Sequence, residues 1–221
     1  MTNRQKIGLI VLIFILLIAA VISAHLRSGS QTPPPPDVPV QQPEDAQAPT
    51  PSPTASIKTL ADPIADAQSR ITKKPFGIHI TPATSPVQPE RFSGYHTGTD
   101  FETTPAEADA AIPFYAICSG NIVAKRTASG YGAVLVQACN IADQPVTVIY
   151  GHVSLQSIAK NIGDALAAGE QIGILGHSPD ETDGERKHLH VGIHKGTAIN
   201  ILGYVQKPAD LDGWLDWQKL Q

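Results

Sequence analysis

Two histidines separated by one residue, His188 and His190, have the type and the spacing to do chemistry together. In a β-strand the side chains alternate between the two faces, so both imidazoles would point the same way. Two imidazoles on one face can bind one metal ion together, or one can bind the metal while the other transfers protons. Which of these applies depends on the other side chains that the chain brings to the same place.

Three further residues could complete such a site. His96 stands four residues before Asp100, across a turn that contains glycine, and His152 lies just past the end of a predicted strand. Zinc sites of exported proteins use His nitrogens and a carboxylate oxygen, and a catalytic site keeps three protein ligands and one position for water. His96, Asp100 and one member of the pair would supply those three ligands.

Two other metal motifs fit the sequence less well. His190 and His194 have the spacing of a helical zinc-protease motif, but that motif needs Glu after the first His, where Val191 stands. Two His and one carboxylate also suit non-haem Fe(II) oxygenases. Those enzymes place the carboxylate two residues after the first His, whereas here it follows four residues later.

The first 56 residues predict an anchor and a spacer. Ile7 to Ala24 is an unbroken apolar run, and at about 1.5 Å per residue it nearly spans a hydrocarbon core of roughly 30 Å. We therefore expect residues 1–27 to be a cytoplasmic stub and a transmembrane signal anchor, although small residues near its end leave cleavage open. Residues 28–56 are rich in proline and predict a disordered, extended tether or, alternatively, a proline-motif ligand.

Residues 57–221 predict one folded domain that is mainly β. Short apolar segments with turn signals about every ten residues are typical of an antiparallel sandwich or barrel. A short helix is expected within residues 57–72, and a closing segment should bury Trp214 and Trp217. The expected strands are 77–82, 112–125 with a break at 119–120, 133–139, 146–150, 171–176 and 188–194.

The charge and the cysteine content of the chain argue against several classes of function. The chain has 221 residues and a net charge of −4, which indicates neither nucleic-acid binding nor attraction to an anionic membrane surface. Its two Cys are too few for a disulfide-rich scaffold or a Cys-based zinc module. Cys118 and Cys139 lie on the two arms of one predicted hairpin, so either a disulfide or two buried thiols is expected there.

The motifs, taken in order, resemble those of the lysostaphin-type (LytM-like) zinc metallopeptidases. They are His96-Thr-Gly-Thr-Asp100, then Tyr150-Gly-His152, then His188-Leu-His190. The segment Asn161 to Gly176 is similar to the family's pattern of Gly-Asp followed by Gly-Gln-x-Ile-Gly, and the resemblance covers about residues 74–200. It implies an antiparallel β-sheet sandwich of the LytM/lysostaphin catalytic-domain type, with the site in a groove between loops.

Carried over residue by residue, the resemblance implies that His96, Asp100 and His190 bind Zn²⁺. His152 and His188 would stand beside the catalytic water. Zinc makes such a water more acidic, and a neutral imidazole can take its proton near neutral pH. We expect His188 to be the general base and His152 to assist it, although the two roles could be exchanged.

The function that the resemblance implies is a zinc metalloendopeptidase that hydrolyses peptide bonds in peptidoglycan cross-links or stems. With the predicted anchor, it would be a single-pass protein of the cell membrane whose catalytic domain lies on the extracytoplasmic side. The alternative is a non-catalytic LytM-like module that regulates another cell-wall hydrolase. An exported metal-binding protein is a third possibility, and the sequence indicates no particular protein partner.

The segment before the histidine pair departs from the family pattern. Gly176 to Lys187 is polar and charged, whereas the family has a run of small residues there. Arg186 or Lys187 could meet a carboxylate of the substrate, and a solvated loop is the alternative interpretation. Thr81 to Arg91, with its three Pro, could cover the groove and make the enzyme latent.

Overall fold

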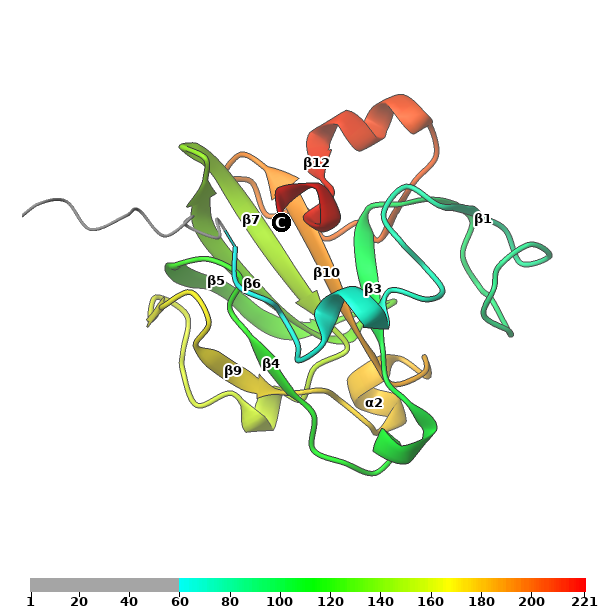
Figure 1. The fold of residues 1–221 in the computed structure, drawn as a ribbon, viewed down its shortest axis with the longest axis horizontal. Helices are drawn as coiled ribbons and strands as arrows, with labels where there is room; N and C mark the ends of the chain where they lie inside the picture. The colour runs from blue at the N-terminus through cyan, green and yellow to red at the C-terminus, as the bar shows by residue number, and fades with distance from the viewer. Residues whose placement is uncertain (1–59) are drawn as a thin grey trace, which may run out of the picture. The chain divides into compact units, whose positions relative to one another are not determined.

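The computed structural model of the chain describes residues 60–221, whose fold is shown in Figure 1. All of these residues fall within one compact unit. The predicted anchor and the predicted proline-rich tether lie outside the described residues. In the part that the structure describes, no helix is both long and apolar enough to cross a membrane.

A seven-stranded antiparallel sheet is the largest element of the fold. Its path runs β12-β10-β7-β6-β5-β8, and β3 pairs with β10 beside that path. In Figure 1, β10 runs between β7 and β3. This architecture confirms the prediction of a mainly antiparallel β domain. The strands of the sheet are β3 (Gly98–Glu102), β5 (Gly120–Ala128), β6 (Gly132–Ile141), β7 (Gln144–Gly151), β8 (Ala165–Leu166), β10 (His188–Lys195) and β12 (Trp214–Leu215).

Two small sheets and several short helices complete the domain. One sheet has the order β1-β2-β11, with β1 (His79–Ile80), β2 (Gly94–His96) and β11 (Tyr204–Val205). The other pairs β4 (Pro113–Tyr115) with β9 (Gln171–Ile174). The helices are α2 (Pro179–Thr182) and the 3₁₀ turns η1 (Ala67–Arg70), η2 (Pro105–Glu107), η3 (Leu155–Ser157), η4 (Pro208–Gly213) and η5 (Trp217–Leu220).

The main sheet is covered on both faces, which explains the continuous apolar runs in its central strands. In β6, Leu135 packs in the larger hydrophobic cluster, while its neighbours Val134 and Val136 pack in a smaller one with Trp214. Side chains alternate along a strand, so the two clusters lie on opposite faces. Trp217 is buried in the larger cluster, and the expected burial of both Trp is confirmed.

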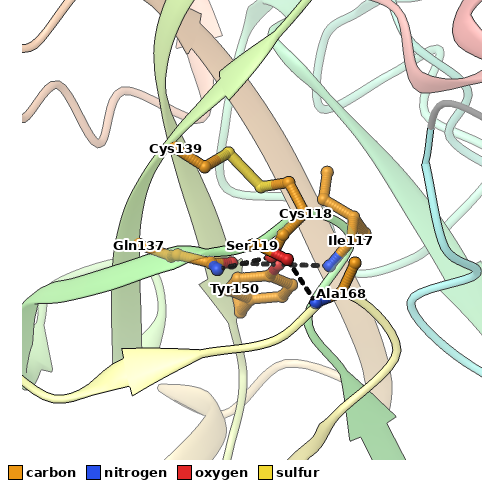
Figure 2. The surroundings of a disulfide bond; sticks show 7 residues. All are labelled: Ile117, Cys118, Ser119, Gln137, Cys139, Tyr150 and Ala168. Atoms are coloured by element: carbon orange, nitrogen blue, oxygen red, sulfur yellow. Dashed lines mark hydrogen bonds between the residues drawn. A yellow bond between two sulfur atoms is a disulfide. The ribbon is translucent and has the colours of Figure 1, made fainter. Parts of the chain in front are cut away.

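The strand region expected at 112–125 is divided in the structure. Its first part is β4, which pairs with β9, and its second part is β5, which pairs with β6. A disulfide between Cys118 and Cys139 ties this junction to β6, as Figure 2 shows, and confirms one of the two alternatives. Beside it, the Gln137 amide donates to the Cys118 carbonyl at 2.7 Å, and the Tyr150 hydroxyl donates to Gln137 Oε1 at 2.9 Å. A covalent bond and buried hydrogen bonds therefore hold the end of the sheet together.

Candidate metal centre

Three buried side chains converge where β2, β3 and β10 meet. His96, Asp100 and His190 each place one possible ligand atom within 4.8 Å of the other two. His190 Nδ1 lies 3.0 Å from Asp100 Oδ1 and 3.2 Å from His96 Nε2. The distance from His96 Nε2 to Asp100 Oδ1 is 3.4 Å. The structure thus brings together the three residues that the sequence assigned to the metal.

Strand register produces this convergence. In the antiparallel pairing of β10 with β3, His190 is directly opposite Asp100, and on its other side it is opposite Gly151 of β7. Space for the imidazole comes from Gly98 in β3. A Cβ atom at Gly98 would lie 2.5 Å from His190 Cε1 and 2.7 Å from the Val191 carbonyl oxygen. Glycine is therefore required at this position by the close approach of the ring.

The protonation states of His190 and Asp100 suit a metal ion. Burial lowers the pKa of His190 to about 4, against the opposing effect of Asp100, so its ring is neutral at pH 7. Burial alone would raise the pKa of Asp100, but the neighbouring His188, His96 and His190 outweigh it and hold that pKa well below its usual value. Neutral imidazoles and an ionised carboxylate are the forms that bind zinc, and two His with one carboxylate is a known catalytic zinc set.

His188 and His152 lie beside this set and are held through their Nδ1 atoms. His188 Nδ1 donates to the Arg186 carbonyl at 2.8 Å, and His152 Nδ1 donates to the Thr182 carbonyl at 3.3 Å. A carbonyl oxygen only accepts, so each neutral ring carries its hydrogen on Nδ1 and a lone pair on Nε2. The two ring centroids are 4.3 Å apart. Both histidines therefore have a nitrogen that can accept a proton.

The two histidines differ in their surroundings. His188 Nε2 is 3.3 Å from Asp100 Oδ2, so a proton taken up at Nε2 would have an acceptor there. His152 has a backbone φ of 61°, a conformation that residues other than glycine rarely adopt. Burial lowers the pKa of His152 well below its usual value. Strained residues of this kind are concentrated at functional sites.

Arg186 and Lys187 bind other parts of the chain, so the interpretation of a solvated loop is wrong for both. Arg186 Nη2 donates to Asp100 Oδ2 at 2.9 Å, and Arg186 also pairs with Glu102. Lys187 Nζ donates to backbone carbonyls of the chain, among them that of Glu107 at 3.0 Å. Both side chains are engaged within the chain, so neither is a solvated loop residue. Arg186 also lines the site cavity, and its Nη1 has no hydrogen-bond partner among the described residues, so its contact with a substrate carboxylate stays a prediction.

Tyr131 is a site residue that sequence reasoning missed. The sequence motifs gave Tyr131 no role in the site, and no local pattern indicates the direction of its side chain. Its hydroxyl oxygen lies 3.3 Å from His190 Nε2. With Nδ1 as the ligand atom, His190 carries its hydrogen on Nε2 and donates it to Tyr131, which fixes the tautomer and the ring orientation.

The site opens into a cavity of about 370 Å³ that all five predicted site residues line. One wall is aromatic, because the rings of Phe92 and Tyr204 stack with centroids 5.6 Å apart. Tyr204 also lies against His96, at 5.2 Å between ring centroids. No residue from Thr81 to Arg91 lines the cavity, so the structure gives no support to the predicted covering of the groove by that segment.

Comparisons with known proteins identify the family of this chain. Residues 94–201 match the family model described as peptidase family M23. No curated protein matches the chain in sequence.

Several solved structures are similar to the chain. Csd3 of Helicobacter pylori is 22% identical with a TM-score of 0.43, over 67% of this chain and 35% of Csd3. LytU is 22% identical with a TM-score of 0.45, over 66% of this chain and 80% of LytU. A zinc-containing peptidase from Vibrio cholerae is 22% identical with a TM-score of 0.40, over 60% of this chain and 35% of that peptidase. The match thus spans about a third of the length of Csd3 and of the Vibrio cholerae peptidase.

Proposed function

Because residues 94–201 of this chain belong to peptidase family M23, we propose that the protein is a zinc metalloendopeptidase that hydrolyses peptide bonds in peptidoglycan cross-links or stems. The observation that carries this proposal is the convergence of His96, Asp100 and His190 beside two further histidines. A structural role alone would not require five buried, mutually adjacent polar side chains around one cavity.

His96 Nε2, Asp100 Oδ1 and His190 Nδ1 would hold the zinc ion. When bound, zinc supplies a Lewis acid that polarises the scissile carbonyl and makes water more acidic. The chain's own residues exclude bulk solvent from this place, since all three are at most 3% exposed. Low exposure strengthens the electrostatic interactions within the site.

His188 is the general base in this proposal. Its Nδ1 is fixed on the Arg186 carbonyl, so Nε2 takes the proton of the attacking water, and Asp100 Oδ2 at 3.3 Å accepts a hydrogen bond from the resulting imidazolium. His152, whose ring lies next to that of His188 and whose Nδ1 is held by the Thr182 carbonyl, assists by accepting a hydrogen bond at Nε2 that orients the attacking water.

The proposed location is the cell membrane, with residues 1–27 as the anchor, 28–56 as the tether and 57–221 as the extracytoplasmic catalytic domain. The disulfide between Cys118 and Cys139 supports export, because disulfides persist mainly in oxidising compartments. Peptidoglycan, a glycan polymer cross-linked by short peptides, is the substrate that such a tethered domain would meet.

Digestion of purified peptidoglycan by the full-length chain in detergent tests the proposal. We expect new free amino termini and soluble peptides, loss of both with a chelator, and recovery when zinc is added back. A zinc-loaded chain that releases no peptide from any peptidoglycan type would overturn the proposal. The non-catalytic module that regulates another cell-wall hydrolase would then be the better account.

A further inference from the structure

A buried charge pair lies directly behind the candidate metal ligand Asp100. Arg186 Nε donates to Glu102 Oε2 at 2.9 Å, and its Nη2 donates both to Glu102 Oε1 and to Asp100 Oδ2, the latter at 2.9 Å. The Arg186 side chain is 17% exposed and that of Glu102 is 8% exposed. One guanidinium therefore joins two carboxylates, of which only one faces the other candidate ligands.

The contact from Arg186 distinguishes the two oxygens of Asp100. Oδ1 lies 3.0 Å from His190 Nδ1, on the side of the candidate metal ligands, whereas Oδ2 is engaged by Arg186. A carboxylate with one oxygen held by a guanidinium can offer a metal only its other oxygen, in a fixed direction. The guanidinium therefore selects one-oxygen binding by Asp100.

A cation next to a metal site weakens metal binding by repulsion, and Glu102 removes this effect. Arg stays charged at any pH of interest, and alone it would repel a divalent ion bound to the same carboxylate. Glu102 pairs with it through both oxygens, so the two side chains together add no net charge. Lys73 Nζ lies 3.5 Å from Glu102, but its side chain is 44% exposed and its charge is screened by solvent.

We propose that Arg186 and Glu102 form a neutral clamp, in which Arg186 orients Asp100 for one-oxygen binding and Glu102 cancels the Arg186 charge so that zinc affinity is kept. Both are positioning residues, and the inference rests on the proposed function because it concerns the same metal. Orientation should govern turnover, and charge balance should govern affinity. The two residues lie close to the candidate ligands because of their places on the strands. Glu102 is opposite His188 in the pairing of β3 with β10, and Arg186 precedes the first residue of β10 by two positions.

Zinc dissociation constants of the full-length chain, measured by competition with a chromophoric chelator, test the clamp. In Glu102→Gln the Arg186 charge is unbalanced, so we expect zinc binding to weaken about tenfold. The double variant Glu102→Gln/Arg186→Met restores the balance, and we expect its dissociation constant to return to within about threefold of wild type, while peptide release stays at least about tenfold lower. A residue with a merely structural role would not give tighter binding in the double variant than in the single one.

Glu107→Gln is the matched control. Glu107 accepts from Arg70 Nη1 at 2.9 Å and from Arg70 Nη2 at 2.7 Å, so this variant also removes the carboxylate from a paired guanidinium, but one that makes no contact with the candidate ligands. We expect its zinc dissociation constant to be unchanged. Two results would overturn the clamp. One is an equal loss of zinc affinity in Glu107→Gln and Glu102→Gln, and the other is a double variant that binds zinc no more tightly than Glu102→Gln does.

Arg186→Met alone should change zinc affinity in the opposite direction, and it tests the clamp if Glu102→Gln does not fold. It leaves Glu102 unbalanced, so zinc should bind at least as tightly as in wild type, while peptide release falls about tenfold. Weaker zinc binding in Arg186→Met would contradict the clamp. A wild-type chain that binds no zinc would overturn both the clamp and the proposed function, whereas one that binds zinc without releasing peptide would overturn only the proposed function.

Discussion

At the scale of single residues, His188 and His190 occupy the same strand but make different contacts. His190 Nδ1 lies near both His96 and Asp100 Oδ1, whereas His188 Nδ1 is used by a backbone carbonyl and only its Nε2 approaches Asp100. Two histidines that are equivalent in a sequence pattern are therefore distinguished by the acceptors around them. This geometry agrees with one ligand and one proton carrier.

Tyr131→Phe isolates the hydrogen bond to the remote nitrogen of His190. The variant keeps the ring but removes the acceptor for Nε2, so the imidazole loses its fixed tautomer and we expect zinc affinity to fall about tenfold. Competition with a chelator measures the change. Tyr150→Phe is the control, because its hydroxyl also makes buried hydrogen bonds, at 2.9 Å to Gln137 and from Ile117, and should affect stability alone. Equal zinc affinity in wild type and Tyr131→Phe would show that Tyr131 has no role in zinc binding.

The sequence could predict the five histidine and aspartate positions because their chemical types are rare and their order is informative. It could not predict the roles of Tyr131, Arg186 or Glu102. These residues act through contacts between strands, and such contacts depend on register and side-chain direction rather than on local pattern. Arg186 also had a plausible solvated interpretation, which only the position of Asp100 and Glu102 excludes.

At the scale of elements, the approach of β3 to β10 sets the space for the metal ligand. Gly98→Ala would place a methyl group 2.5 Å from the His190 ring and 2.7 Å from a backbone oxygen, and neither can move freely. We expect a loss of about 1–3 kcal/mol in the free energy of unfolding and a large loss of bound zinc. Chemical denaturation and zinc analysis measure the two effects.

Gly213→Ala is the control for that substitution. Its new Cβ would have no neighbour closer than 3.9 Å, so stability and zinc content should remain near those of wild type. Wild-type zinc content in Gly98→Ala would show that zinc binding does not depend on the close approach of β3 to β10.

The turns η1 and η2 are joined by the pair of Arg70 and Glu107. The hydrogen bond from Arg70 lowers the pKa of Glu107 from 4.5 to about 2. Because the pKa is lower in the folded state, the stabilisation is complete above about pH 4.5 and is lost as the pH falls toward 2. We expect the free energy of unfolding of wild type to exceed that of Glu107→Gln by about 1 kcal/mol at pH 6 and by close to zero at pH 2. The difference is small even at pH 6 because the pair is partly exposed. A difference that does not depend on pH, measured by urea unfolding, would contradict this assignment.

At the scale of the whole domain, the disulfide and the metal site lie at different ends of the central strands. Cys139 is opposite Val146 in β7, whereas His190 is opposite Gly151, about 17 Å further along that strand. We therefore expect the double variant Cys118→Ala/Cys139→Ala to lose about 2–4 kcal/mol of stability and to keep its zinc affinity. A large fall in zinc affinity at a temperature where the variant is folded would show that the two ends are coupled.

The β class of the domain was predictable, because few other fold classes are compatible with short apolar segments, alternating or continuous, that are separated by turn signals. The strands expected at 146–150 and 188–194 lie within β7 and β10. The division of 112–125 between two sheets was not predictable, since β4 pairs with β9, more than fifty residues away in sequence. The short helix expected in residues 57–72 is a single 3₁₀ turn, η1, within the described part of the chain.

The zinc content of purified His188→Ala and His190→Ala chains tests the central claim most directly. Wild type and His188→Ala should each hold about one zinc ion per chain, because His188 is outside the ligand set, and His190→Ala should hold little. Peptide release should be lost in both variants. Equal zinc loss in the two variants would contradict the account, because both histidines would then be ligands and the chain would lack its assigned base.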